Sequence, residues 1–296
     1  MHFPSDVNID FHWVNALILL YAETHYAFKG IYSRLKKNEP EIIADLPHRL
    51  DPGQAIPILL LIKDANLYPV ELHQVRITIN SDKSIKVVTR DFNALRITSR
   101  FWHRVIEIPA NQEFTGKCQV EVIIEYSVAK KKYKVTSDNH NCSTHAPFDL
   151  FISEDKLPKT AGWFFGEFHC HTNYTNDQVE FGAPLEATQS LAQAMGLTFF
   201  CATDHSYDLD DDPDDYLKKD PFQKKWQDFQ RTVEKLNEAN SSCLIVPGEE
   251  VSAGNGKKRN VHFLILNHPD LLPGDGDSAE KWFRTRPDFS IAEILA

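Results

Sequence analysis

Histidine and carboxylate residues recur at the ends of apolar runs in the second half of the sequence. The first run leads to His169, with His171 two residues later and Asp177 in the polar stretch that follows. Residues i and i+2 of a strand point to the same side, so we expect the two imidazoles to project together. Parallel α/β architectures place their chemistry at such C-terminal strand ends. The pair alone is weak evidence for a metal site, and two surface or loop histidines are the alternative.

Three later segments strengthen the case for a metal site. One apolar run ends at Asp204 and His205, a second ends at Glu249 and Glu250, and a third contains His262. Imidazole nitrogens combined with carboxylate oxygens suit zinc, manganese or iron. The sequence therefore predicts a site for divalent metal ions built from several strand ends.

The composition is that of an ordinary globular protein. The chain has 296 residues, 42% hydrophobic and 25% charged, which suggests two domains or one large domain. Its net charge of −10 and the lack of a basic patch interleaved with aromatic residues argue against nucleic acid as a partner. We find neither a transmembrane segment nor a signal peptide, and expect no membrane partner. The oligomeric state stays open.

The five cysteines are odd in number and show no close spacing. Buried free thiols in a reducing compartment are therefore expected, which favours a cytoplasmic location. We expect Cys170, which lies between the two histidines, to point away from them into the core.

Two patterns divide the chain. Residues 41–150 contain short apolar runs separated by turn residues, which indicates a β-sandwich, so we assign 1–150 to an accessory domain in which 1–40 are uncertain. Residues 151–162 form a linker. After the linker we expect a buried strand that includes Trp163, Phe164, Phe165 and Phe168. Alternating helices and strands follow, which indicates parallel βαβ units. These elements are strands at 163–170, 197–203, 244–247 and 261–266 and helices at 184–195 and 221–240.

The metal-ligand segments together resemble the polymerase and histidinol phosphatase (PHP) superfamily of metal-dependent phosphoesterases. The matching segments are Phe168-His-Cys-His-Thr with Asp177 downstream, Thr203-Asp-His205, Pro247-Gly-Glu-Glu-Val-Ser252 and Val261-His262. The lead-in Trp163-Phe-Phe-Gly166 and the preceding β-sandwich look like the branch that includes carbamate and related ester hydrolases. The resemblance covers residues 163–296. It implies an α/β fold, an incomplete distorted (βα)7 PHP-type barrel preceded by an all-β sandwich, with two or three divalent metal ions.

The resemblance also implies a role for each matching residue. His169, His171 and Glu250 would hold the first metal, with Glu250 bridging to a second. His262 would join the second metal, and Asp177 and His205 would hold a third. We group Asp204 with His205 as catalytic residues, with Asp204 orienting His205 or a neighbour through a hydrogen bond. Glu249 occupies a position that usually faces away from the metals.

A short basic segment precedes His262. Its residues Lys257, Lys258 and Arg259 would contact an anionic substrate, or else form a solvated turn. Both interpretations stay open at this point.

The sequence departs from the superfamily in its last part. Two later segments, a strand ending in His and another ending in Asp-x-His, are absent; His268 resembles the first but follows His262 without an intervening helix. Only four of seven barrel strands are accounted for. We therefore expect 163–296 to be the N-terminal part of a truncated PHP domain, with an open sheet edge and exposed apolar surface. The alternative is a natural chain with a degenerate site.

Three functions remain under consideration. The first is a metal-dependent hydrolase, a phosphoesterase that acts on a small-molecule phosphate ester with metal-activated water. The second is hydrolysis of carboxyl or carbamate esters at the same metals, which rests on the branch resemblance alone. The third belongs to another class, a non-catalytic scaffold or binding protein with a degenerate site.

Overall fold

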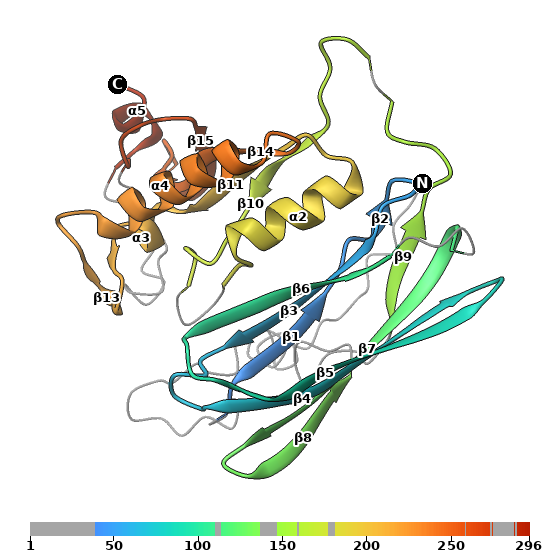
Figure 1. Ribbon diagram of the computed structural model, residues 1–296. Helices are drawn as coiled ribbons and strands as arrows, with labels where there is room; N and C mark the ends of the chain where they lie inside the picture. The colour runs from blue at the N-terminus through green and yellow to red at the C-terminus, as the bar shows by residue number, and fades with distance from the viewer. Residues whose placement is uncertain are drawn as a thin grey trace, which may run out of the picture.

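The structure of the chain is a computed structural model, shown in Figure 1. It describes residues 39–109, 114–136, 147–158, 160–176, 181–257, 259–272, 274, 287 and 289–296. Asp177, Lys258 and nearly all of the uncertain segment 1–40 lie outside the described residues.

Two sheets face each other in the first half of the chain (Figure 1). The smaller sheet has the order β1 (Glu41–Asp45), β3 (Ile56–Lys63), β6 (Phe101–Ile108). The larger has the order β2 (Arg49–Leu50), β9 (Phe148–Ile152), β7 (Gly116–Val128), β4 (Val70–Ser81), β5 (Ile85–Ile97), and β8 (Lys131–Thr136) pairs with β7. All of these pairings are antiparallel except that between β2 and β9.

The sequence pattern of these strands explains the packing. β4 alternates, so that Val75, Ile77 and Ile79 are fully buried on one face while the intervening residues are partly or fully exposed. β3 is buried along its whole length, because its sheet also contacts helix α2 (Leu185–Met195). Ala194 of that helix belongs to the same apolar cluster as both sheets. We call this pair of sheets the sandwich.

A second unit of four strands carries the candidate site. Its order is β10 (Gly166–Cys170), β11 (Phe199–His205), β14 (Leu244–Gly254), β15 (Asn260–Leu266), and we call it the metal sheet. The first three strands are parallel. Helix α2 connects β10 to β11. The short helix α3 (Ser206–Leu209), the hairpin of β12 (Asp211–Asp212) and β13 (Asp215–Lys219), and helix α4 (Lys224–Ala239) connect β11 to β14.

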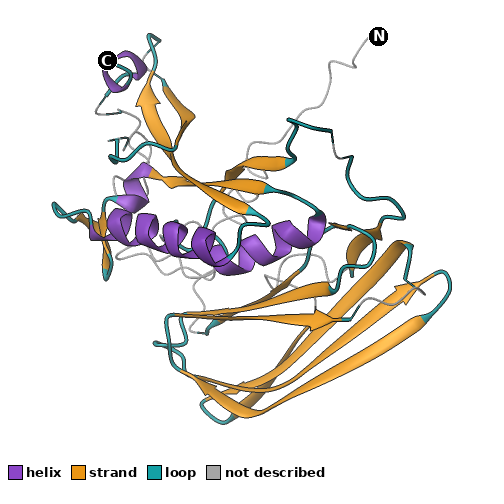
Figure 2. Ribbon diagram, turned by 45° about the horizontal axis from the view of Figure 1, so that its top comes forward, coloured by secondary structure: helices purple, strands orange, loops and turns teal. Residues whose placement is uncertain are grey.

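Helices α2 and α4 cover one face of the metal sheet. The apolar stripe of α4, including Trp226, Phe229 and Val233, packs with Phe200 and Ile245 of the strands. Figure 2 shows both helices as a band between the metal sheet and the sandwich. The short helix α5 (Ile291–Ile294) follows later in the chain. Among the described residues, no helix is long and apolar enough to cross a membrane.

The structure contradicts the expected (βα)7 barrel. Strands predominate in the described residues, and β15 runs antiparallel to β14. The connection between them is a tight turn in which the Asn255 N–H donates to the Arg259 carbonyl at 2.9 Å. A turn this short holds no crossover helix, and a parallel pair requires one. The α/β assignment is therefore wrong: the protein consists mostly of sheets, and its site lies on a mixed four-stranded sheet. The predicted domain boundaries remain predictions.

The expected buried strand at 163–170 is also wrong. β10 begins at Gly166 and forms one edge of the metal sheet, pairing only with β11 among the described strands. Trp163, Phe164 and Phe168 are 76%, 72% and 58% exposed. An apolar run predicts burial only when other elements cover the side chains on the faces of its strand, and no described part of the chain covers these three aromatic side chains.

Candidate metal centre

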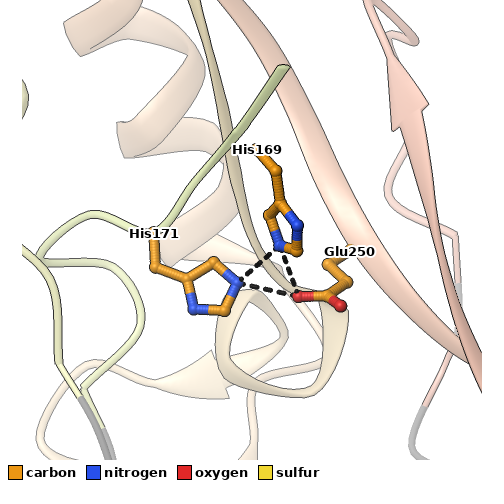
Figure 3. Close-up of side chains that lie close together, drawn as sticks. All are labelled: His169, His171 and Glu250. Atoms are coloured by element: carbon orange, nitrogen blue, oxygen red, sulfur yellow. Dashed lines mark hydrogen bonds and ion pairs between the residues drawn. The ribbon is translucent and has the colours of Figure 1, made fainter. Parts of the chain in front are cut away.

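Glu250 of β14 lies among four histidines. Its Oε2 atom is 2.9 Å from His169 Nε2 and 2.7 Å from His171 Nε2, and these two nitrogens are 3.1 Å apart (Figure 3). His169 belongs to β10, and His171 follows that strand directly. The i, i+2 spacing thus brings both imidazoles to the same carboxylate oxygen.

Two further histidines approach the same carboxylate. His262 Nδ1 lies 2.7 Å from Glu250 Oε1, and His205 Nδ1 lies 3.4 Å from Glu250 Oε2. Strand register explains both positions. His205 of β11 lies opposite Glu250, and His262 of β15 lies opposite Ser252, which points to the same side of β14 as Glu250.

These donors form two groups that could hold divalent cations. One is His169, His171 and Glu250, and the other is His205, Glu250 and His262; within each group the ligand atoms lie within 4.8 Å of one another. A zinc ion bonds imidazole nitrogens at about 2.0–2.1 Å, so neighbouring ligands of a tetrahedral ion lie about 3.4 Å apart. The separations in the first group are slightly shorter than this value. The donor set therefore fits a divalent metal.

Burial and charge differ across the centre. The Glu250 side chain is 7% exposed, whereas those of His169, His171 and His262 are 46%, 23% and 32% exposed. Burial opposes ionisation of Glu250, but hydrogen bonds to His171 and His262 and the charge of His205 outweigh it and lower the Glu250 pKa. The carboxylate is thus held ionised at the buried side together with His205, while His169, His171 and His262 are partly exposed.

Asp204 fixes the backbone beside His171 and is not part of either metal group. Its Oδ1 accepts hydrogen bonds from the backbone N–H groups of Thr172 and Thr175 at 2.7 and 2.8 Å, and its Oδ2 accepts from the Thr172 hydroxyl at 2.7 Å. Thr175 Oγ1 in turn accepts a hydrogen bond from His205 N–H. Asp204 is fully buried. Its contacts orient the loop that presents His171.

Glu249 lies on the opposite side of β14 from Glu250. Its Oε2 accepts from the Ser206 hydroxyl at 2.7 Å, and its Oε1 accepts from the Leu272 N–H at 2.9 Å. Burial raises the pKa of Glu249 to about 7, although these two hydrogen bonds act in the other direction. Because Ser206 directly follows His205, Glu249 holds the segment that carries a candidate ligand.

Several sequence-predicted residues lie apart from the cluster. Lys257 and Arg259 are exposed, and their backbone N–H groups bond Asn255 Oδ1 in the turn after β14. That turn begins five residues beyond Glu250, about 17 Å along a strand. Lys258 and Asp177 lie outside the described residues.

Two other residues that the sequence singled out are also outside both metal groups. His268 bonds the backbone of Asp270. Cys170 packs against the apolar cluster beneath the metal sheet, and burial together with the charges of Asp204 and Glu167 raises its thiol pKa to about 12.

The position of His205 and the contacts of three hydroxyl residues were not predicted from the sequence. His205, which the resemblance grouped with Asp177, lies beside Glu250 and His262, and its ring stacks on Tyr207 with centroids 4.5 Å apart. The sequence analysis also missed Thr172, Thr175 and Ser206. The only signal for them was the run of hydroxyl and amide residues directly after the His-x-His pair and the serine after Asp204-His205.

Comparisons with known proteins do not show a family. No protein-family model matches the chain, and no curated protein matches it. Among solved structures, one similar chain is the CARDB domain of the PF1109 protein from Pyrococcus furiosus in complex with di-metal ions. It is 12% identical, has a TM-score of 0.22, and the match covers 41% of this chain and 98% of that one.

A second similar chain is a cycloisomaltooligosaccharide glucanotransferase from Paenibacillus sp. in complex with cycloisomaltoheptaose. It is 12% identical with a TM-score of 0.20, and the match covers 69% of this chain and 27% of that one. Both TM-scores are too low to carry an argument about this protein.

Proposed function

We propose that the protein is a metal-dependent hydrolase of phosphate esters. The observation that carries the proposal is the position of Glu250, whose two carboxylate oxygens face different histidines: His169 and His171 on one side, His262 on the other. A carboxylate shared in this way is suited to bridge two cations. The motifs that resemble the PHP superfamily support the same activity.

The candidate ligands and the buried residues behind them would have different roles in this activity. His169, His171, His205 and His262 would hold the ions as neutral imidazoles, and Glu250 would partly offset their charge. Bound divalent ions lower the pKa of a coordinated water and neutralise charge on a phosphoryl group. Asp204 and Glu249 would keep the ligands in place from the buried side.

The solvent-facing side of the centre is where a substrate would enter. His169 is the most exposed of the ligands that contact Glu250, and it lies on the edge strand of the metal sheet. A small phosphate ester would reach the ions from this side. We propose zinc, manganese or iron as the metal, because imidazole and carboxylate donors suit these ions. A cytoplasmic location is proposed because Cys118, Cys170, Cys201 and Cys243 are free thiols.

A second candidate activity is hydrolysis of a carboxyl or carbamate ester at the same centre. The position of Lys257 and Arg259 favours it, because both are exposed in a turn that begins five residues beyond Glu250 and neither belongs to a metal group, so substrate charge would be balanced by the metal ions alone. A neutral ester needs less such compensation than a phosphate ester.

Elemental analysis and an ester panel test the proposal. We expect purified protein to contain zinc, manganese or iron, and the double variant His169→Ala/His171→Ala to lose it. We then expect hydrolysis of p-nitrophenyl phosphate by the wild type and none by the double variant. Hydrolysis of p-nitrophenyl acetate alone would select the ester activity. Metal binding without turnover of any ester would select a non-catalytic binding protein.

A further inference from the structure

The loop between β10 and α2 folds back on itself beside His171. Thr172 pairs with Ala183, and Asn176 pairs with Phe181, as isolated bridges. The Gly182 N–H donates to the Thr172 carbonyl at 3.1 Å. The approach is so close that a Cβ at Gly182 would collide with the carbonyl group of His171. A shift of the returning segment 181–183 would therefore displace the backbone of His171.

The sandwich contacts this returning segment through Phe181. The Phe181 ring lies 4.6 Å from Lys63 Nζ of β3, and its centroid is 6.3 Å from that of Phe101 on β6. Lys63 and Phe101 are cross-strand partners in the smaller sheet. The Lys63 side chain is only 4% exposed, and Asp64 Oδ2 lies 3.5 Å from its ammonium group. A buried ammonium group over an aromatic face is a short-range, directional contact.

The sandwich also holds both ends of α2, the helix that follows the returning segment. Arg49 donates to the Met195 carbonyl at 2.6 Å, and the Asp51 N–H donates to the Ala194 carbonyl at 3.3 Å. At the other end, His103 Nε2 lies 3.2 Å from Glu186 Oε1. The helix therefore gives the returning segment a fixed attachment on its C-terminal side, and Phe181 provides one on its N-terminal side.

We propose that Phe181 is a positioning residue for the metal centre, through which the sandwich fixes the place of His171. The inference rests on the proposed metal centre and extends it, because it assigns a role to the first half of the chain. Contact passes from Lys63 and Phe101 to the Phe181 ring, then through Gly182 to the His171 backbone. Loss of the ring would leave all ligands present but would let His171 move relative to Glu250.

Calorimetric titration of the full, chelator-stripped chain with Mn²⁺ and with Zn²⁺ tests this role. Phe181→Leu keeps an apolar side chain but removes the ring, and we expect it to weaken cation binding about 10-fold, the effect typical of residues that orient a metal ligand. Phe181→Tyr keeps the ring and should bind as the wild type does. Phe92→Leu is the matched control, because Phe92 also lies over a cation, 6.0 Å from Arg104 Cζ, but on β5 of the larger sheet, whereas Lys63 and Phe101 belong to the smaller sheet.

Thermal unfolding of the metal-free variants separates positioning from stability. We expect Phe181→Leu and Phe92→Leu to lower the melting temperature similarly, while only Phe181→Leu weakens cation binding. Wild-type affinity in Phe181→Leu, together with loss of binding in His171→Ala, would overturn the positioning role and leave the metal centre intact. Wild-type affinity in His171→Ala would overturn the metal centre itself. Equal weakening in Phe181→Leu and Phe181→Tyr would also contradict a role for the ring.

Discussion

β4 of the sandwich and β14 of the metal sheet are both interior strands, yet they bury different chemistry. The most deeply buried residues of β4 are all apolar: Val70, Leu72, Val75, Ile77 and Ile79. β14 instead buries Glu249, Glu250 and Ser252 together with Val251 and Ala253. β4 alternates between a covered and a solvent-facing side, whereas β14 is covered on both sides from Gly248 to Gly254.

This difference separates the two regions in what stabilises them. The sandwich gains its stability from apolar burial and needs no ligand. In β14, Glu249 and Glu250 point to opposite sides, so each buried carboxyl group needs its own compensation. Glu249 has two hydrogen-bond donors, and Glu250 has histidines that could hold cations. The metal sheet should therefore respond to cations and pH, and the interior of the sandwich should respond to neither.

The largest effect should come from a cavity in the sandwich. Ile77→Ala removes a fully buried side chain, and we expect it to lower the free energy of unfolding by about 2–5 kcal/mol. The cation affinity of the folded protein should stay unchanged, because β4 pairs with β5 and β7 in the sandwich and carries none of the candidate ligands. Urea unfolding and calorimetric titration measure the two quantities. Val87→Ala, at a position 58% exposed, is the control and should change stability by less than about 0.5 kcal/mol.

The next effect should come from the shared carboxylate. Glu250→Gln keeps the shape of the side chain but removes the charge that faces both histidine groups, so we expect cation affinity to fall about 100-fold or more. Glu249→Gln makes the same change one residue earlier, on the other side of β14; its amide oxygen can still accept from the Ser206 hydroxyl, so it should lose much less affinity than Glu250→Gln. A similar loss in both variants would show that the two sides of β14 are not independent.

The sequence predicted the centre better than the fold around it. The His-x-His pair, the strand-end position of His205 and the paired carboxylates each depend on one strand and its side-chain alternation, which local sequence determines. Glu250, His169, His171, His205 and His262 do come together. The resemblance in these motifs did not predict whether β15 runs parallel or antiparallel to β14. The direction of β15 follows from the short turn at 255–259, which permits only an antiparallel pair.

Burial was the other property that local sequence could not predict. The aromatic run from Trp163 has the composition of a core strand, but its exposure depends on what lies beyond β10, which is not local to the run. Asp204 shows the same limit at the scale of one side chain. Its type and position predicted a supporting role. Its partners, Thr172 and Thr175, follow β10 and reach Asp204 only through the fold of that loop, which the local sequence around Asp204 does not determine.

Asp204→Asn should give a smaller, mixed effect. The amide cannot supply the negative charge that three donors from Thr172 and Thr175 share, so we expect a loss of about 1–3 kcal/mol in unfolding free energy. Cation affinity should also fall, because the loop that carries His171 loosens. Asp82→Asn, at an exposed position of the sandwich, is the control for a simple change of net charge. Unchanged affinity in Asp204→Asn would mean that the loop holds its place without this carboxylate.

The last effect should be a pH dependence that originates at Glu249 and is spread over several pH units. Burial raises its pKa to about 7, above the value of about 4.3 for an unfolded chain, so the folded state binds this proton more tightly. The contribution of Glu249 to stability is therefore complete below about pH 4 and declines as the pH rises towards 7, by at most about 1.4 kcal/mol per pH unit. Glu249→Gln should remove this decline.

Unfolding by urea in the presence of a chelator, at intervals from pH 4.5 to 8, measures the difference between the wild type and Glu249→Gln. Comparing the two chains cancels the titration of the histidines and of Glu250, which both share. The wild type should lose stability relative to the variant up to about pH 7, and the difference should then level off. Parallel curves would mean that the hydrogen bonds from Ser206 and Leu272 keep Glu249 ionised throughout this pH range.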